Sequence, residues 1–162
     1  KINKYKEILS KHKFKKFVGI AWKSSNVESG NKSLQLNDLK PLFAKKNIGF
    51  INLQYGNNSE LKTFNKNNNN AIISIKEIDL FQQIDDVISL IHCLDAVVTT
   101  PNVNVHFAGS IGKKCIVASP FDNELFLYSK LNDGKCEWYK NQKTFIVNDN
   151  PNSIFEQITK SL

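Results

Sequence analysis

The sequence predicts a doubly wound α/β fold, a single Rossmann-like domain with about six parallel strands and helices on both faces of the sheet. Short apolar runs alternate along the chain with segments of helical periodicity. Most of these runs are apolar throughout, a pattern typical of strands buried on both faces of a helix-covered parallel sheet. At 162 residues the chain is long enough for one such domain and too short for two of ordinary size.

The expected strands are short apolar runs that end at turn-forming or helix-starting residues. They cover residues 17–22, 49–54, 71–75, 96–99, 115–118 and 144–147. Because helical patterns separate these runs, the strands are expected to form one parallel sheet covered by helices on both faces.

The expected helices lie between these strands. We expect Asn37 to cap a helix that contains Leu39, Leu42 and Phe43, and a short helix over 59–64 to lead into an Asn-rich loop over 65–70. A further helix is predicted over 103–111, ended by Gly112, and a closing helix begins at Pro151. The core-facing positions of the helix before the fourth strand recur at helical spacing, and they are Ile84, Val87, Ile88, Ile91 and Leu94.

The net charge of +7 is concentrated in a Lys-rich leader over residues 1–16, which we expect to be a helix or a linker from a preceding domain. The leader holds seven lysines and one glutamate, a charge of +6, so residues 17–162 carry 7 − 6 = +1. A nucleic-acid-binding domain usually spreads its basic residues over a folded face, so nucleic acid is not an expected partner. The absence of methionine, even at position 1, favours a fragment of a longer protein.

Other classes of protein are not expected from the composition. No run is long and apolar enough to span a bilayer and no signal peptide is recognisable, so a cytoplasmic location is expected. Cys93, Cys115 and Cys136 are widely spaced and predict free thiols, without a metal site. All 22 basic residues are lysine, so a bound phosphate would have to rely on lysines, backbone amides and helix dipoles.

The expected ligand crevice lies beyond the carboxyl ends of the strands, where the loops lead into helices. This rule selects residues 23–26, 54–57, 77–79 and 100–106. The dinucleotide fingerprint after the first strand, a Walker loop and the nucleophile elbow of the α/β-hydrolases are all absent from the sequence. An ordinary NAD enzyme, a P-loop ATPase and an α/β-hydrolase are therefore not expected.

The turn at 100–106 is the most informative of these segments. Pro101 ends the preceding strand, and Asn102 is well suited to cap the following helix. The first amides of that helix, with the positive end of its dipole, would form a site for a diphosphate. His106 lies about one turn into the helix, where it could reach a phosphate or a sugar hydroxyl. The residues alone leave open that His106 is structural and Asn102 only a cap.

Two runs within this region, residues 94–100 and 106–114, resemble a segment of bacterial heptosyltransferase-like (family 9-like) glycosyltransferases. They are closer still to the glycosyltransferase-like domains that follow tetratricopeptide repeats in large bacterial proteins. Further segments are similar to those proteins in the same order, and they cover 19–26, 32–34, 53–56, 78–81, 85–86 and 138–139.

The resemblance implies a two-domain (GT-B) glycosyltransferase whose C-terminal half binds a nucleotide diphosphate sugar without a metal or another cofactor. The turn that contains Asn102, Val103, Asn104 and His106 would hold the diphosphate. Lys23 would help to neutralise it, beside the hydroxyls of Ser24 and Ser25. The nucleoside side would be lined by Gln54, Tyr55 and Asp79, with Gly56 in the same loop. The resemblance assigns no catalytic residue.

The chain departs from the family pattern just before this helix. Many relatives have an acidic residue followed by Thr or Ser there, and that acid is tied to the donor sugar, whereas this chain has Pro101 and Asn102. Two main interpretations follow. The first is a donor-binding domain that is inactive without the N-terminal half, which would bind a glycan, a lipid-linked sugar or a protein as acceptor. The second is a catalytically silent binding module. An unrelated Rossmann-like or flavodoxin-like regulatory domain is a third alternative.

Overall fold

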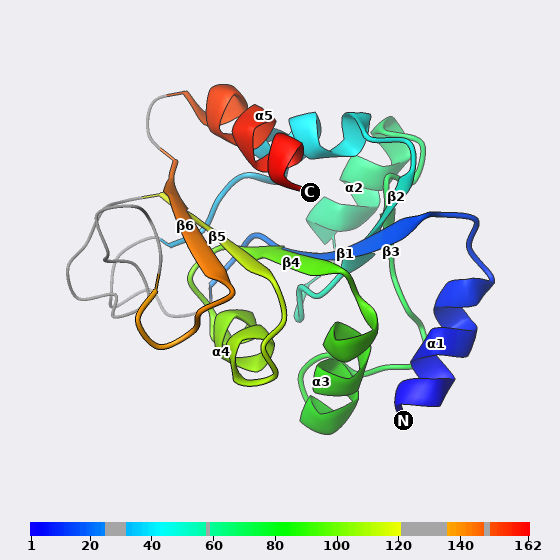
Figure 1. The fold of residues 1–162 in the computed structure, drawn as a ribbon. Coiled ribbons are helices and arrows are strands. Elements are labelled where there is room, and N and C mark those ends of the chain that lie inside the picture. The colour runs from blue at the N-terminus through cyan, green and yellow to red at the C-terminus, as the bar shows by residue number, and fades with distance from the viewer. Residues whose placement is uncertain (25–31, 58, 121–135, 148–149) are drawn as a thin grey trace.

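The computed structural model describes residues 1–24, 32–57, 59–120, 136–147 and 150–162. Over these residues the chain forms a single sheet in which all strand pairs are parallel, with the order β3-β2-β1-β4-β5-β6 (Figure 1). The strands are β1 (Lys16–Ala21), β2 (Ile48–Asn52), β3 (Ile72–Ile73), β4 (Ala96–Thr99), β5 (Cys115–Ser119) and β6 (Gln142–Ile146). This confirms the predicted α/β fold, and the strand order is that of a doubly wound Rossmann-like sheet.

Helices cover both faces of the sheet, as the apolar strands predict (Figure 1). They are α1 (Ile2–Ser10), the 3-10 helix η1 (Leu36–Ala44), α2 (Ser59–Asn67), α3 (Ile84–Cys93), α4 (Val103–Ser110) and α5 (Pro151–Ser161). One apolar core lies between the sheet and η1, α2 and α5, and it includes Ile20, Leu42 and Phe155. A second core lies under α1, α3 and α4, and it includes Val97 and Val105.

The point at which the strand order reverses lies between β1 and β4. The chain first proceeds outward from β1 to β2 and β3, then returns to β4 on the other side of β1. Gly19 pairs with Ile51 of β2 on one side and with Val97 of β4 on the other. The loops after β1 and β4 therefore leave in opposite directions and open a crevice between them.

The Lys-rich leader contributes its own buried side chains to this domain. Tyr5 of α1 is fully buried, and α1 packs on α3. The Tyr5 hydroxyl donates a hydrogen bond of 2.8 Å to the Asp86 carboxylate, which also lies 2.7 Å from the Lys1 ammonium. The hydrogen bonds from Lys1 and Tyr5 hold the pKa of Asp86 below its usual range.

Two predicted elements on the β2–β3 side differ from their expected form. The helix after β1 is a 3-10 helix that begins at Leu36 after its cap Gln35, two residues before the predicted position, so Asn37 does not cap it. Pro41 lies inside this helix and has no amide to donate. The third strand consists of only two of the five predicted residues, Ile72 and Ile73, which pair with Phe50 and Ile51 of β2.

The Asn-rich segment is helical in its first part. Helix α2 continues to Asn67, and the chain then turns through Asn69 and Asn70, whose positive φ values of 51° and 53° asparagine tolerates. Asn65 was predicted to lie in a loop, but it belongs to α2. Its side-chain amide pairs with the backbone of Ile72, donating to the carbonyl at 2.7 Å and accepting from the amide at 3.1 Å.

The predicted apolar face of α3 is confirmed at Val87, Ile91 and Leu94, which are buried. It is wrong at Ile84, the first residue of the helix, which is 50% exposed, and Ile88 is only half-buried. Leu90, which was not predicted, is fully buried instead. Smaller differences concern the end of the sheet, where β6 begins at Gln142, two residues before the predicted start.

Ile91 and Ile84 form a matched test of the core. We expect Ile91→Ala to lower the free energy of unfolding by about 2–5 kcal/mol, because it opens a cavity under the sheet. Ile84→Ala in the same helix should change it by less than about 0.5 kcal/mol, since the side chain is half exposed. Urea unfolding followed by circular dichroism measures both values, and equal losses would contradict the described packing of α3.

Candidate functional site

The candidate site lies where β1, β2 and β4 end at the carboxyl edge of the sheet. Ile20 pairs with Asn52, and Ala21 pairs with Thr99, so the three strands end at about the same height. The Thr100 amide donates to the Ala21 carbonyl at 3.1 Å and extends the β1–β4 ladder by one step. Three of the four predicted segments are thereby brought together at the switch point.

Gln54 links the backbone that follows β1 to the end of β2 by hydrogen bonds. Its Oε1 atom accepts hydrogen bonds from the amides of Trp22 and Lys23, at 3.1 and 2.8 Å. The backbone amide of Gln54 donates to the Asn52 side-chain oxygen at 2.9 Å. Because the Gln54 side chain uses its oxygen to hold the backbone after β1, its role in the described chain is to position the crevice.

Asn102 fixes the amino end of α4, as its position before the helix predicts. Its Oδ1 atom accepts from the Asn104 amide at 2.9 Å and from the Thr99 hydroxyl at 3.0 Å. Its Nδ2 group donates to the Lys23 carbonyl at 3.2 Å. The cap therefore binds α4 to the loop after β1, across the switch point.

Asn104 ties the same helix to the end of β2. It is almost fully buried, and its Nδ2 group lies 3.5 Å from the Leu53 carbonyl, at the limit of a hydrogen bond. The Val105 amide donates to the Asn102 carbonyl. Within the described chain this leaves the Val103 amide, on a residue that is 42% exposed, available for a ligand at the positive end of the helix.

Lys23 forms an ion pair with Glu60 at the start of α2. The same carboxylate accepts from the Trp22 indole at 3.1 Å and from the Leu36 amide at 3.3 Å. Burial raises the pKa of Glu60, but the hydrogen bonds from Lys23, Trp22 and Leu36 outweigh burial and leave the pKa below its usual value of 4.5. The Lys23 ammonium is thus held by α2, and sequence reasoning missed Glu60 because no local pattern marks it.

Lys32 is a second lysine beside the crevice, and sequence reasoning gave it no role. Its carbonyl accepts from the buried Thr100 hydroxyl, so its backbone lies next to the loop that leads into α4. Lys32 is buried, and burial lowers the pKa of its ammonium. A buried lysine gains from a nearby anion, because the anion offsets the desolvation of its charge.

A cleft of about 610 Å³ lies beside these exits, between the loop after β2 and the segment that precedes α3. Gln54, Tyr55, Gly56 and Asp79 of the predicted site line it, together with Phe81. The Tyr55 and Phe81 rings lie 5.5 Å apart at an angle of 40°, and Phe81 is 63% exposed. An exposed ring that lines a cleft, as that of Phe81 does, offers a surface on which a planar base can stack.

Asp79 shapes the segment that carries Phe81. Its carboxylate accepts hydrogen bonds from the amides of Phe81 and Gln82, at 2.8 and 3.0 Å. These two bonds hold the pKa of Asp79 below its usual range. The carboxylate is exposed, so it stays accessible from the cleft while it orders the turn.

His106 does not line this cleft, and it contacts Tyr139 instead. Its Nδ1 atom is 3.0 Å from the Tyr139 hydroxyl, and the two rings meet edge to face. The Tyr139 ring also lies against Gly109, where a Cβ atom would come within 2.3 Å of it. The structure therefore gives His106 a partner whose role sequence reasoning missed, although Tyr139 lies within the resembling segment 138–139.

The remaining predicted residues are placed as follows. The Ser24 amide lies 3.2 Å from the Ser33 hydroxyl, so Ser24 belongs to the loop that leaves β1. Gly56 has a φ of 92°, which a side chain would disfavour. Ser25 lies outside the described residues. In the described parts of the chain no group of three or more His, Cys, Asp or Glu side chains could hold a metal ion.

The fold and this crevice define a Rossmann-like α/β domain with an open switch point between β1 and β4. No family model matches the chain. The chain is similar to Protein FlbA of Caulobacter vibrioides, with 27% identity over 133 residues that cover 80% of this chain and 22% of FlbA. The chain thus spans about a fifth of the length of that relative. Over the described residues, no helix has the length and apolar character to cross a membrane.

The Glu60 ion pair has a pH dependence that can be measured. Because the pKa of Glu60 is lower in the folded state, its carboxylate stabilises the fold above its usual pKa of 4.5. This contribution is lost as the pH falls through the folded-state pKa. We therefore expect Glu60→Gln to destabilise the protein at pH 7, and the difference from the parent protein to shrink below about pH 4.5.

Urea unfolding at a series of pH values checks this expectation. Glu156→Gln is a matched control, because Glu156 is exposed on α5 and forms no ion pair within the described chain. A difference between the parent protein and Glu60→Gln that stays constant down to pH 3, or that grows in acid, would contradict the ion pair described above.

Proposed function

We propose that this domain binds a nucleotide diphosphate sugar and forms the donor-binding half of a glycosyltransferase. The observation that carries the proposal is the pair of asparagines at the start of α4. Asn102 and Asn104 tie the amino end of this helix to the backbone after β1 and β2. The cleft bordered by Tyr55 and Phe81 lies at the end of that same β2 strand.

The diphosphate is proposed to bind at the amino end of α4. The Val103 amide and the helix dipole favour an anion there, and the cap on Asn104 keeps the backbone in place without ligand. Lys32 is proposed as a second contact because its carbonyl accepts from the Thr100 hydroxyl, which places it beside the loop that leads into α4. Lys23 contributes through its exposed side, since its ammonium is already bound to Glu60.

The nucleoside is proposed to bind in the cleft of about 610 Å³ beside Gln54. The base stacks on Phe81, whose ring is exposed and is supported by Tyr55. Asp79 holds the Phe81 turn and presents a carboxylate that can accept a hydrogen bond from a ribose hydroxyl.

The proposed reaction needs a second domain to bring the acceptor, which would be a glycan, a lipid-linked sugar or a protein. We expect the 162-residue domain alone to bind its donor and to transfer no sugar. No cofactor is part of the proposal, because helix dipole and lysines supply the positive charge at the diphosphate. A cytoplasmic location is also proposed, and the free thiols Cys93, Cys115 and Cys136 suit a reducing compartment.

A catalytically silent binding module is the second candidate. It is favoured by Pro101, which is buried and stands where many of the resembling enzymes have an acidic residue. The Lys23–Glu60 ion pair also favours a silent module. Lys23 was predicted to neutralise the diphosphate, and in this ion pair its ammonium is already bound to Glu60. The two candidates differ in whether the domain binds a nucleotide diphosphate with useful affinity.

Titration calorimetry with UDP, ADP and GDP separates the two candidates. The donor-domain proposal predicts that one of these nucleotides binds with micromolar affinity, and equally well in the presence of a chelator. Absence of binding by all three at millimolar concentration would support the silent module instead. Transfer of radiolabelled sugar by the isolated domain would contradict the proposed need for an acceptor half.

Single substitutions then locate the nucleotide. Phe81→Ala should weaken binding about tenfold through the loss of base stacking, whereas Phe14→Ala, an exposed aromatic at the opposite edge of the sheet, should leave it unchanged. Lys32→Gln should weaken binding through the diphosphate, and Lys62→Gln on α2 is its charge-matched control. Equal effects of each variant and its control would place the nucleotide elsewhere.

A further inference from the structure

The connections that lead into the strands gather lysines at the amino edge of the sheet, opposite the candidate site. We define the amino edge as residues 13–16, 45–47, 94–95, 112–114 and 140–141. It holds one acidic residue, Asp95, and eight lysines, which are Lys13, Lys15, Lys16, Lys45, Lys46, Lys113, Lys114 and Lys140. The other 14 of the 22 lysines are balanced by the other 14 of the 15 acidic residues, so this edge accounts for the whole net charge of +7.

Backbone hydrogen bonds place these connections side by side. The Lys15 amide donates to the Asn47 carbonyl at 3.0 Å, which joins the connections into β1 and β2. The Asp95 amide donates to the Phe17 carbonyl, and the Cys115 amide donates to the Asn141 carbonyl, both near 2.9 Å. Five neighbouring strands span about 19 Å. Segments far apart in the sequence therefore form one continuous basic edge.

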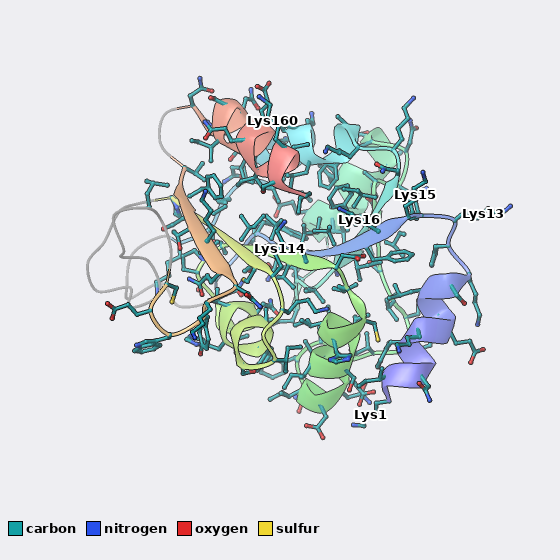
Figure 2. The ribbon with its side chains drawn as sticks, viewed as in Figure 1. Lys1, Lys13, Lys15, Lys16, Lys114 and Lys160 are labelled. Atoms are coloured by element: carbon teal, nitrogen blue, oxygen red, sulfur yellow. The ribbon has the colours of Figure 1, made fainter. Side chains whose placement is uncertain are left out.

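Figure 2 shows where several of these lysines lie. Lys13, Lys15 and Lys16 lie in the connection into β1 and at its start, Lys114 lies before β5, and Lys160 lies on α5. The starts of β1 and β5 contact the end of α5, because the Lys16 and Lys114 ammonium groups donate to the carbonyls of residues 162 and 161. Lys160, which lies outside the amino edge as defined, is another exposed lysine on α5.

The fold itself accounts for three of the eight edge lysines. In a parallel α/β domain the carboxyl ends of the helices lie at the amino edge, and their free carbonyls attract cations. Lys16 and Lys114 bind the end of α5, and Lys113 donates to the carbonyls of His92 and Leu94 at the end of α3.

The other five edge lysines have no such role. Lys13, Lys15, Lys46 and Lys140 are exposed and Lys45 is half-buried. Across the described ranges no side-chain hydrogen bond or ion pair involves any of their ammonium groups. No ion pair with a described residue offsets their mutual repulsion, so this surface is suited to an anionic partner.

We propose that the amino edge binds the surface of an anionic lipid bilayer. Lysines act as mobile point charges and suit the diffuse negative charge of a layer of lipid headgroups. Phe14 lies among the lysines, 37% exposed between Lys13 and Lys15, and provides the apolar contact that strengthens binding at a membrane interface.

This arrangement leaves the candidate site open. The strands run from the basic edge to the crevice, so a domain that lies on a bilayer by its amino edge turns the start of α4 and the Tyr55–Phe81 cleft away from the lipid. Membrane binding and nucleotide binding are therefore independent, and the membrane proposal holds even if the domain binds no nucleotide.

Sedimentation with vesicles tests the proposal. The domain should bind vesicles of phosphatidylcholine with about 30% phosphatidylglycerol, not bind pure phosphatidylcholine, and be released between about 0.1 and 0.5 M salt. The edge variant is Lys13→Gln, Lys15→Gln, Lys46→Gln and Lys140→Gln combined. It should bind at least about tenfold more weakly. UDP should leave vesicle binding unchanged.

The control variant combines Lys4→Gln, Lys62→Gln, Lys76→Gln and Lys143→Gln, which are exposed lysines outside the amino edge. It removes the same charge, so vesicle binding that falls less than about threefold supports the proposal. Equal losses in the two variants, binding to neutral vesicles, or no binding to anionic vesicles would overturn it. So would tighter binding of a single-stranded oligonucleotide that is lost in the edge variant. Circular dichroism spectra confirm that both variants fold.

Discussion

The parallel direction of all the described strands is the constraint on which the other features depend. Because each connecting helix must run back against the strands, its amino end lies at the carboxyl edge of the sheet and its carboxyl end lies at the amino edge. The first consequence is the start of α4, where a capped helix end faces the switch point. The second is the amino edge, where Lys16, Lys113 and Lys114 meet free carbonyls. One topology thus separates the capped end of α4 from a lysine-rich edge.

The residues around the capped end of α4 form hydrogen bonds within the fold. Asn102 satisfies three partners at once, and Gln54 holds two amides of the neighbouring loop. Such a site is rigid before any ligand arrives, and a ligand therefore loses little energy in ordering it. The aromatic side of the cleft differs, since Phe81 is held by a turn on Asp79 and keeps its ring exposed.

The sequence predicted the fold class, and it predicted the strands and helices near the switch point most closely. The strand over 96–99 and the start of the helix at Val103 agree with the structure, because Pro101 and Asn102 mark the turn between them. Elements that depend on their neighbours were predicted less well. β3 forms only two of its five predicted residues against β2, and Ile84 is exposed although its spacing fits the core.

Side-chain pairings between distant segments could not be predicted from the sequence. The Glu60 carboxylate that binds Lys23 lies on another element, and nothing near either residue marks the pair. The position of the net positive charge in the folded domain could not be predicted for the same reason. Counted along the chain, the positive charge is concentrated in the leader, whereas the sheet brings together lysines from four separate connections. The local periodicity of a sequence predicts its helices and strands, whereas only the topology of the sheet shows which loops lie at the same edge.

The most direct test of the central claim is a nitrogen–proton correlation spectrum of the domain during titration with a nucleoside diphosphate. If the amino end of α4 holds the diphosphate, the amides of Val103, Asn104 and Val105 should shift together with that of Tyr55. The amides of Lys113 and Lys114 at the opposite edge should not move. Shifts confined to the amino edge, or none at the start of α4 when the nucleotide is bound, would contradict the account.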